Sequence, residues 1–202
     1  ASFIEAGVDI ILTNSFGGTS FRLKLHQAEN SVNALNLAAA GLARQAADTA
    51  DKPVLVAGSM GPTGELFQPL GTLTADAAEQ AFAEQALALA EGGADLLWIE
   101  TMSSLEEVDA AVKGARQTNL PVVATMTFDT AGRTMMGVTP AAYTEFATSL
   151  GLDAFGANCG IGPAELLDTV QKFENGKKKP PLIAKGNCGI PAYVDGKIHY
   201  HG

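Results

Sequence analysis

The chain has 202 residues, 47% of them hydrophobic and 17% charged, a composition typical of a globular protein with one sizeable core. Its 13 basic and 22 acidic residues give a formal net charge of −9, so its surface would repel a nucleic-acid backbone or an anionic membrane. No apolar run is long enough for a membrane span, and the start lacks the basic head and apolar run of a signal peptide. We therefore expect a cytoplasmic protein that acts on a small molecule and has no nucleic-acid or membrane partner.

Six short apolar runs along the chain predict strands. In chain order they cover residues 9–13, 53–58, 95–100, 121–128, 153–158 and 182–187. Segments with helical period lie between them, and cap signals at Ser104, Thr139-Pro140 and Gly162-Pro163 mark helix starts. Because the runs are continuously apolar rather than alternating, they predict a parallel sheet covered by helices. A barrel and a doubly wound sheet both fit this pattern.

Polar and glycine-rich residues gather where the predicted strands end, and in a β/α barrel that face holds the active site. These clusters cover residues 13–18, 58–62, 100–101, 158–160 and 186–189. A closed barrel needs eight strands in about 250 residues. We therefore predict an α/β protein with the (β/α)8 TIM barrel fold, six of its eight β/α units being visible. One unit would precede Ala1 and one would follow Gly202, so residues 1–202 would be a barrel domain truncated at both ends.

Several motifs follow one another at the ends of the predicted strands. They are Glu5-Ala6-Gly7-Val8-Asp9 leading into Thr13-Asn14-Ser15-Phe16-Gly17, then Ala57-Gly58-Ser59-Met60-Gly61-Pro62, Ile99-Glu100-Thr101, Gly156-Ala157-Asn158-Cys159-Gly160 and Gly186-Asn187-Cys188-Gly189-Ile190-Pro191. In this order they resemble the motifs of the homocysteine S-methyltransferase family, which includes betaine-homocysteine methyltransferases, S-methylmethionine-dependent enzymes and the N-terminal domain of cobalamin-dependent methionine synthase. The resemblance runs through the whole chain and implies a homocysteine-binding barrel domain.

The resemblance implies zinc-dependent transfer of a methyl group from an activated donor to the thiol of homocysteine, which gives methionine. In the family, three cysteines hold the zinc, one following an asparagine and an adjacent pair after the eighth strand. Cys159 matches the first ligand, and the pair is expected beyond Gly202. Betaine, other methylated onium compounds, S-methylmethionine and methylcobalamin all serve as donors in the family, so the donor of the full-length protein stays open.

Zinc would solve a chemical problem of this reaction. An alkyl thiol has a pKa of about 8.5 and is a modest nucleophile at neutral pH, whereas coordination to Zn²⁺ removes its proton outright. Three protein thiolates and one exchangeable position make a catalytic site rather than a structural one.

Four further residues are candidates for binding the substrate. Glu100 ends a predicted strand, where its carboxylate could hold the ammonium group of an amino acid, and the resemblance implies the same role. Alternatively, the carboxylate of Glu100 could accept hydrogen bonds from loop amides. Asn14, Ser59 and Asn158 could contact the substrate carboxylate or orient the metal ligands, and loop stabilisation fits each of them equally well.

Other interpretations of the sequence stay open. Lys185 lies within the last predicted strand and could form a Schiff base, as in barrel lyases and aldolases. A non-catalytic zinc-binding homologue and a homo-oligomer are also compatible with the motifs. We expect Cys188 to be a small packing residue rather than a thiol on the metal. His199 and His201 lie in a polar tail after the turn at Asp195-Gly196, and we expect surface or loop histidines there.

Overall fold

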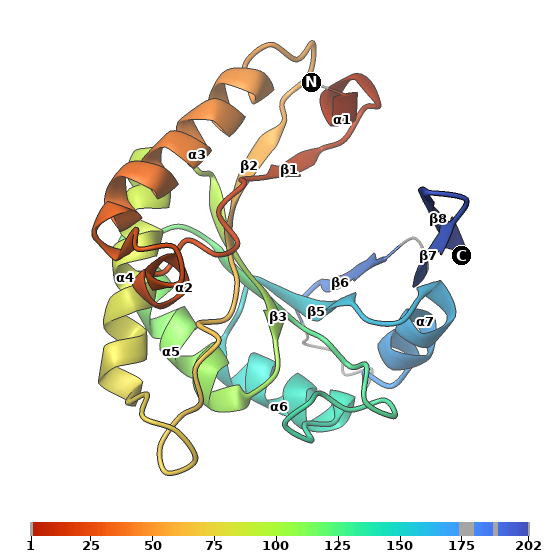
Figure 1. Cartoon of the computed structure of the whole chain (residues 1–202). Coiled ribbons are helices and arrows are strands. Elements are labelled where there is room, and N and C mark those ends of the chain that lie inside the picture. Colours follow the sequence, from red (N-terminus) through yellow and green to blue (C-terminus); the bar gives the residue numbers. More distant parts are fainter. Residues whose placement is uncertain (1, 174–179, 188–189, 202) are drawn as a thin grey trace. The chain divides into compact units, whose positions relative to one another are not determined.

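The computed structural model describes residues 2–173, 180–187 and 190–201. Six strands belong to one sheet, in which their order follows the chain (Figure 1). They are β1 (Ile10–Leu12), β2 (Leu55–Met60), β3 (Leu96–Met102), β4 (Val122–Met126), β5 (Ala154–Cys159) and β6 (Leu182–Gly186). The pairs β1–β2, β2–β3 and β5–β6 are parallel. All six predicted strands are confirmed.

Helices separate these strands along the chain, as the periodicity predicts. They are α1 (Ser2–Glu5), α2 (Ser20–Lys24), η1 (Glu29–Ser31), α3 (Val32–Ala47), α4 (Ala75–Glu91), α5 (Leu105–Ala115), η2 (Arg116–Thr118), α6 (Pro140–Leu150) and α7 (Pro163–Gln171). The Thr139 hydroxyl accepts the amide of Ala142 at the start of α6, and α7 begins at Pro163. Both proline helix starts are therefore confirmed, and α5 begins directly after Ser104.

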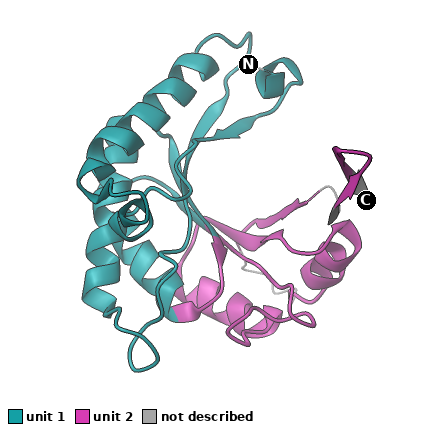
Figure 2. Ribbon diagram, viewed as in Figure 1, with its two compact units in different colours: residues 1–100, 106–123 teal, residues 101–105, 124–202 magenta. Residues whose placement is uncertain are grey.

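The chain divides into two compact units (Figure 2). The first comprises residues 1–100 and 106–123, and the second comprises residues 101–105 and 124–202. In the first unit α3 packs against α4, and the fully buried side chains include Phe82, Leu89 and Leu97. Continuous burial of β2 and β3 explains why their sequences are apolar on both faces.

The second unit has an aromatic core. Phe128, Tyr143, Phe155 and Phe173 pack with ring centroids 5.5–6.4 Å apart, mostly edge to face. The Tyr143 hydroxyl donates to the carbonyl oxygen of Ala124 at 2.8 Å, and burial raises the pKa of this phenol. The hydrogen bond ties α6 to β4 and satisfies a polar group that would otherwise be costly to bury.

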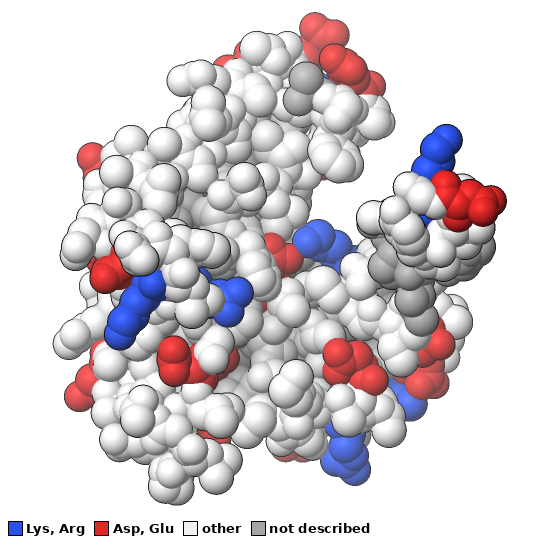
Figure 3. All heavy atoms as spheres, in the orientation of Figure 1, with Lys and Arg blue, Asp and Glu red and all other residues white. Residues whose placement is uncertain are grey.

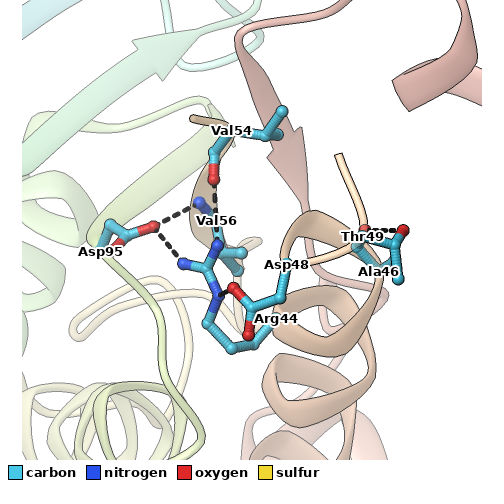
Figure 4. A network of polar contacts seen from close by, with 7 residues as sticks. All are labelled: Arg44, Ala46, Asp48, Thr49, Val54, Val56 and Asp95. Carbon is cyan, nitrogen blue, oxygen red and sulfur yellow. Dashed lines mark hydrogen bonds and ion pairs between the residues drawn. The ribbon is translucent and has the colours of Figure 1, made fainter. Parts of the chain in front are cut away.

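Charged residues join α3 to the amino-terminal ends of β2 and β3 (Figure 4). Arg44 donates to Asp48 at 2.8 Å, to Asp95 at 2.9 Å and to the carbonyl oxygen of Val54 at 3.1 Å. Asp95 also accepts the backbone amide of Val56 at 2.7 Å. This Arg44 network therefore lies at the ends of the strands opposite to the polar motifs.

A hairpin follows the sheet where the sequence suggested a polar tail. Strands β7 (Ile190–Val194) and β8 (Lys197–His201) pair antiparallel across the turn at Asp195 and Gly196, whose φ angles are 50° and 76°. Of the surface or loop histidines that the sequence predicts, the loop part is wrong, because an Asp-Gly pair with left-handed conformations closes a two-residue hairpin. His199 lies on β8 and is exposed, as expected. Cys188 lies outside the described residues.

The lengths of the helices and the charges on the surface bear on binding to membranes and nucleic acids. None of the helices within the described ranges is both long and apolar enough to cross a lipid bilayer. On the face drawn in Figure 3, the charged residues that the structure describes are scattered among uncharged ones and form no continuous basic surface. The distribution agrees with the net charge of −9.

Candidate active-site residues at the strand ends

Cys159 is the last residue of β5 and is half-buried. Its φ of 58° and the φ of 77° at Gly160 turn the chain sharply out of the strand. The side-chain amide of Asn187 donates to the carbonyl oxygen of Gly160 at 3.0 Å, which holds this turn beside the end of β6. The thiol is thus placed at the carboxyl end of a parallel strand, where barrel enzymes carry their functional groups.

Asn158 precedes this cysteine and is almost completely buried, with 1% of its surface exposed. Its Oδ1 accepts the backbone amide of Thr101 at 2.9 Å. Its Nδ2 donates to Thr101 Oγ1 at 2.7 Å and to Cys159 Sγ at 3.2 Å. The main-chain carbonyl of Asn158 accepts from the Thr127 hydroxyl at 3.0 Å. The Asn158 amide is therefore engaged with protein groups, and one of them is the candidate metal ligand.

Glu100 lies in β3 in the first unit and is 5% exposed. Its Oε1 accepts the hydroxyl of Ser59 at 2.5 Å. Ser59 is itself buried at the end of β2, its amide donates to Thr13 Oγ1 at 2.9 Å, and its carbonyl accepts from Ser15 Oγ at 2.7 Å. Ser59 thus orients the carboxylate of Glu100, and two residues that follow β1, Thr13 and Ser15, in turn hold Ser59.

Two buried polar residues from helices support the loop that follows β1, and the motifs did not reveal them. Gln85 of α4 donates to the carbonyl oxygen of Ser15 at 2.7 Å and to Asn36 Oδ1 at 3.1 Å. Asn36 of α3 donates to the carbonyl oxygen of Gly18 at 2.9 Å. A signal did exist, since Gln85 lies three residues after Phe82 on the apolar face of its helix.

Asn14 differs from the other candidates because it is exposed. It lines a cavity of about 250 Å³ together with the following residues Ser15, Phe16 and Gly17. No side-chain hydrogen bond joins Asn14 to another residue in the part of the chain that the structure describes. Its amide is therefore available for a ligand.

Glu107 of α5 holds the loop after β2, a contact that the sequence did not indicate. Its Oε1 accepts the amide of Thr63 at 2.8 Å and the Thr63 hydroxyl at 2.6 Å. Burial raises the pKa of Glu107 above its ordinary value, and the two bonds from Thr63 partly oppose that shift. The loop that carries the Gly61-Pro62 motif is thus anchored to the helix after β3.

Cysteine sulfur is a common zinc ligand in proteins, and the side-chain amide of Asn158 donates to the sulfur of Cys159 at 3.2 Å. Within residues 2–173, 180–187 and 190–201, no three His, Cys, Asp or Glu side chains lie together as a metal site. The role of Cys159 as a metal ligand therefore stays a prediction.

Lys185 lies on β6, in register with Asn158 of β5, and its side chain is exposed. A lysine that forms a Schiff base is typically activated by desolvation in an apolar pocket. The exposure of Lys185 gives no support to that alternative.

Comparison with known proteins places these residues in a family context. The whole chain, residues 1–202, matches the sequence model of the family described as Homocysteine S-methyltransferase. Methionine synthases of Mycobacterium tuberculosis (strain ATCC 25618 / H37Rv) and Mycobacterium leprae (strain TN) are each 31% identical to it, over 199 and 198 residues. Both alignments cover 94% of this chain but only 16% of the relative, so the chain spans a small part of those proteins.

Solved structures show the same fold. The homocysteine methyltransferase MmuM from Escherichia coli, in its oxidized form, has a TM-score of 0.75 and 22% identity, covering 93% of this chain and 68% of that one. Its metallated form has a TM-score of 0.70 and 20% identity, covering 93% and 77%. The predicted α/β class with part of a TIM barrel is therefore confirmed. With a family match along its entire length, the chain belongs to the homocysteine S-methyltransferase family.

Proposed function

We propose that the protein carrying this chain transfers a methyl group from an activated donor to the sulfur of homocysteine, giving methionine, and that Cys159 is one of its zinc ligands. The observation that carries the proposal is the thiol of Cys159 at the carboxyl end of β5, beside the amide of Asn158, in a chain of this family. The alternatives for the whole protein are a zinc-binding homologue without methyl transfer and a Schiff-base enzyme.

Cys159 would hold the metal with its thiolate, and the Asn158 amide would stabilise that thiolate through its 3.2 Å contact to the sulfur. When bound, zinc lowers the pKa of a coordinated thiol, so that a thiolate nucleophile is present at neutral pH. Further ligands would come from residues outside the described ranges.

Glu100 would bind the ammonium group of homocysteine. A buried carboxylate attracts an ammonium strongly because the surrounding dielectric constant is low. The hydroxyl of Ser59, 2.5 Å from Oε1, fixes the direction in which the carboxylate faces. Asn14, with its exposed amide on the 250 Å³ cavity, is available for the substrate carboxylate. Ser59 would act through Glu100 rather than by touching the substrate.

The zinc content and activity of the complete protein test this proposal. We expect Cys159→Ala to lose most bound zinc and most methyl transfer to homocysteine, while thermal unfolding stays cooperative. Cys188→Ala is the matched control, since it also removes one thiol, and it should retain metal and turnover. The methyl donor would be found by screening betaine, S-methylmethionine and methylcobalamin with the unmodified protein.

Three outcomes separate the alternatives. Full zinc content and full turnover in Cys159→Ala would contradict the assignment of the metal ligand. Zinc that depends on Cys159, without methyl transfer from any of the three donors, would indicate the non-catalytic homologue. Trapping of a carbonyl substrate on Lys185 by borohydride would indicate the Schiff-base enzyme.

A further inference from the structure

Thr101 has a backbone conformation that threonine rarely adopts. It lies near the end of β3, and its φ is 64°. In the left-handed region a β-branched side chain crowds its own backbone, so such a residue is a genuine outlier in protein structures. Conformations of this kind persist only where surrounding interactions enforce them.

The interactions that enforce it come from one buried side chain. Thr101 donates its backbone amide to Asn158 Oδ1 at 2.9 Å and accepts from Asn158 Nδ2 at its hydroxyl oxygen, at 2.7 Å. The two bonds close a ring between Thr101 and the amide of Asn158. Both residues belong to the second unit. With both ends of the amide held, Asn158 has one orientation of its side chain.

The same amide reaches the candidate metal ligand. Its Nδ2 carries two hydrogens, one directed at Thr101 Oγ1 and the other at Cys159 Sγ, 3.2 Å away. The Thr101 oxygen itself lies 3.9 Å from the sulfur. Fixing the first hydrogen on threonine therefore fixes the direction of the second one toward the thiol.

From these contacts we infer that Thr101 is a positioning residue for Cys159, acting through the side chain of Asn158 to set the orientation of the sulfur for metal binding. The inference rests on the proposed function, because it takes Cys159 as a ligand. Beyond the ligand itself, the inference assigns a role to Thr101, which would not touch the metal, and to its left-handed backbone conformation, which helps to hold Asn158 in place. Loss of partners that orient a ligand typically lowers metal affinity by about 10- to 100-fold.

Zinc affinity of the complete protein, measured by chelator competition, tests the inference directly. Thr101→Val keeps the branched shape but removes the hydroxyl, and we expect it to bind zinc about 10- to 100-fold more weakly. Thr101→Ser restores the hydroxyl and should bind within about 3-fold of the unmodified protein. Thr144→Val is the matched control, since Thr144 also belongs to the second unit, is buried, and donates its hydroxyl to the carbonyl oxygen of Pro140.

Thr101→Gly separates positioning from folding. Glycine adopts a positive φ without steric cost, and it keeps the backbone amide that bonds Asn158. This variant should therefore unfold at the same temperature or higher than Thr101→Val, yet show the same loss of zinc affinity. With Co²⁺ in place of zinc, the thiolate-to-metal charge-transfer band should shift in Thr101→Val and Thr101→Gly but not in Thr101→Ser.

Unchanged zinc affinity and an unchanged Co²⁺ spectrum in Thr101→Gly would overturn the inference and leave the proposed function intact. A loss of affinity in Thr144→Val as large as that in Thr101→Val would also overturn it, because the effect would then reflect stability. If the unmodified protein binds no zinc, or Cys159→Ala binds it fully, the proposed function fails and takes the inference with it.

Discussion

At the scale of single residues, most of the candidate side chains are occupied with one another. Ser59 bonds Glu100, and Asn158 bonds Thr101 and Cys159. A buried hydrogen bond to a charged group contributes about 1.5–3 kcal/mol, more than a neutral one. These contacts fix the orientation of these side chains, whereas the Asn14 side chain makes no hydrogen bond within the described residues.

Under the proposed function, Ser59→Ala should weaken binding of homocysteine more than it slows methyl transfer. The substitution leaves Oε1 of Glu100 without the 2.5 Å bond from the hydroxyl, so the carboxylate loses its fixed direction. A hydrogen bond to a charged group contributes about 1.5–3 kcal/mol. We therefore expect loss of this bond to raise KM for homocysteine roughly 10- to 100-fold, with a smaller change in kcat. Steady-state kinetics of the complete protein measure both constants. Ser149→Ala, at an exposed hydroxyl on α6, should change neither.

Glu107 gives a prediction about pH. Burial is the largest cause of the raised pKa of Glu107, so the folded state binds the proton of this carboxyl group more tightly than the unfolded state does. In the unfolded state the pKa is near 4.5. Its contribution to stability is therefore complete below that value and is lost as the pH rises through the folded pKa. Glu107→Gln removes the titration while an amide oxygen can still accept both bonds from Thr63.

The stability of Glu107→Gln relative to the unmodified protein should consequently increase between pH 4 and pH 7. Chemical denaturation at several pH values in this interval measures the difference. Glu106→Gln, on the exposed neighbouring position, is the control and should show a difference that does not change with pH. A constant difference for both variants would contradict the role assigned to burial.

At the scale of elements, the sequence predicted strands and helix starts well because each of them has a local pattern. Continuous apolar runs mark the buried strands, and Thr139-Pro140 marks the start of α6. The hairpin of β7 and β8 was missed although Ile190–Val194 is an apolar run and Asp195-Gly196 is a strong hairpin signal, because the charged and histidine residues of Lys197–His201 were interpreted as a polar tail. The contacts of Gln85, Glu107 and Thr101 join residues far apart in the chain, and no local pattern encodes them.

Gly18 tests the buried contacts between the β1 loop and the helices. A Cβ added there would overlap Asn36 Oδ1 and lie 2.6 Å from Gln85 Nε2, so both side chains would have to move. We expect Gly18→Ala to destabilise the fold by about 1–3 kcal/mol, as overpacked sites do. At Gly17 the nearest atom to a new Cβ is 3.8 Å away, so Gly17→Ala is a matched control with little effect. Urea denaturation of both variants provides the comparison.

At the scale of the whole molecule, family and fold class follow from the order of the motifs, because that order reflects the order of the strands. The complete metal site does not follow, since one thiol is found among the described residues and no cluster of three potential ligands. The two ends of the strands also differ in chemistry. The candidate residues lie at the carboxyl ends, and the Arg44 network lies at the amino ends of β2 and β3.

This separation predicts that the Arg44 network affects stability without affecting kinetics. Asp95→Ala removes the partner of both Arg44 and the Val56 amide, and should cost about 1–3 kcal/mol. Asp48→Ala removes only an exposed pair one helical turn away, and should cost less than about 0.5 kcal/mol. Below the unfolding temperature, kcat and KM of both variants should equal those of the unmodified protein. A changed KM in Asp95→Ala would show that the two ends of the strands are coupled.

The hairpin of β7 and β8 has a practical consequence. Its turn at Asp195 and Gly196 is exposed. The two strands pair with each other, from Ile190 opposite His201 to Val194 opposite Lys197 next to the turn. Exposed turns of small and polar residues are the positions where proteins accept inserted sequence most readily. A short peptide tag or a fluorophore attachment site between Asp195 and Gly196 would therefore report on the protein without disturbing β5 and its cysteine.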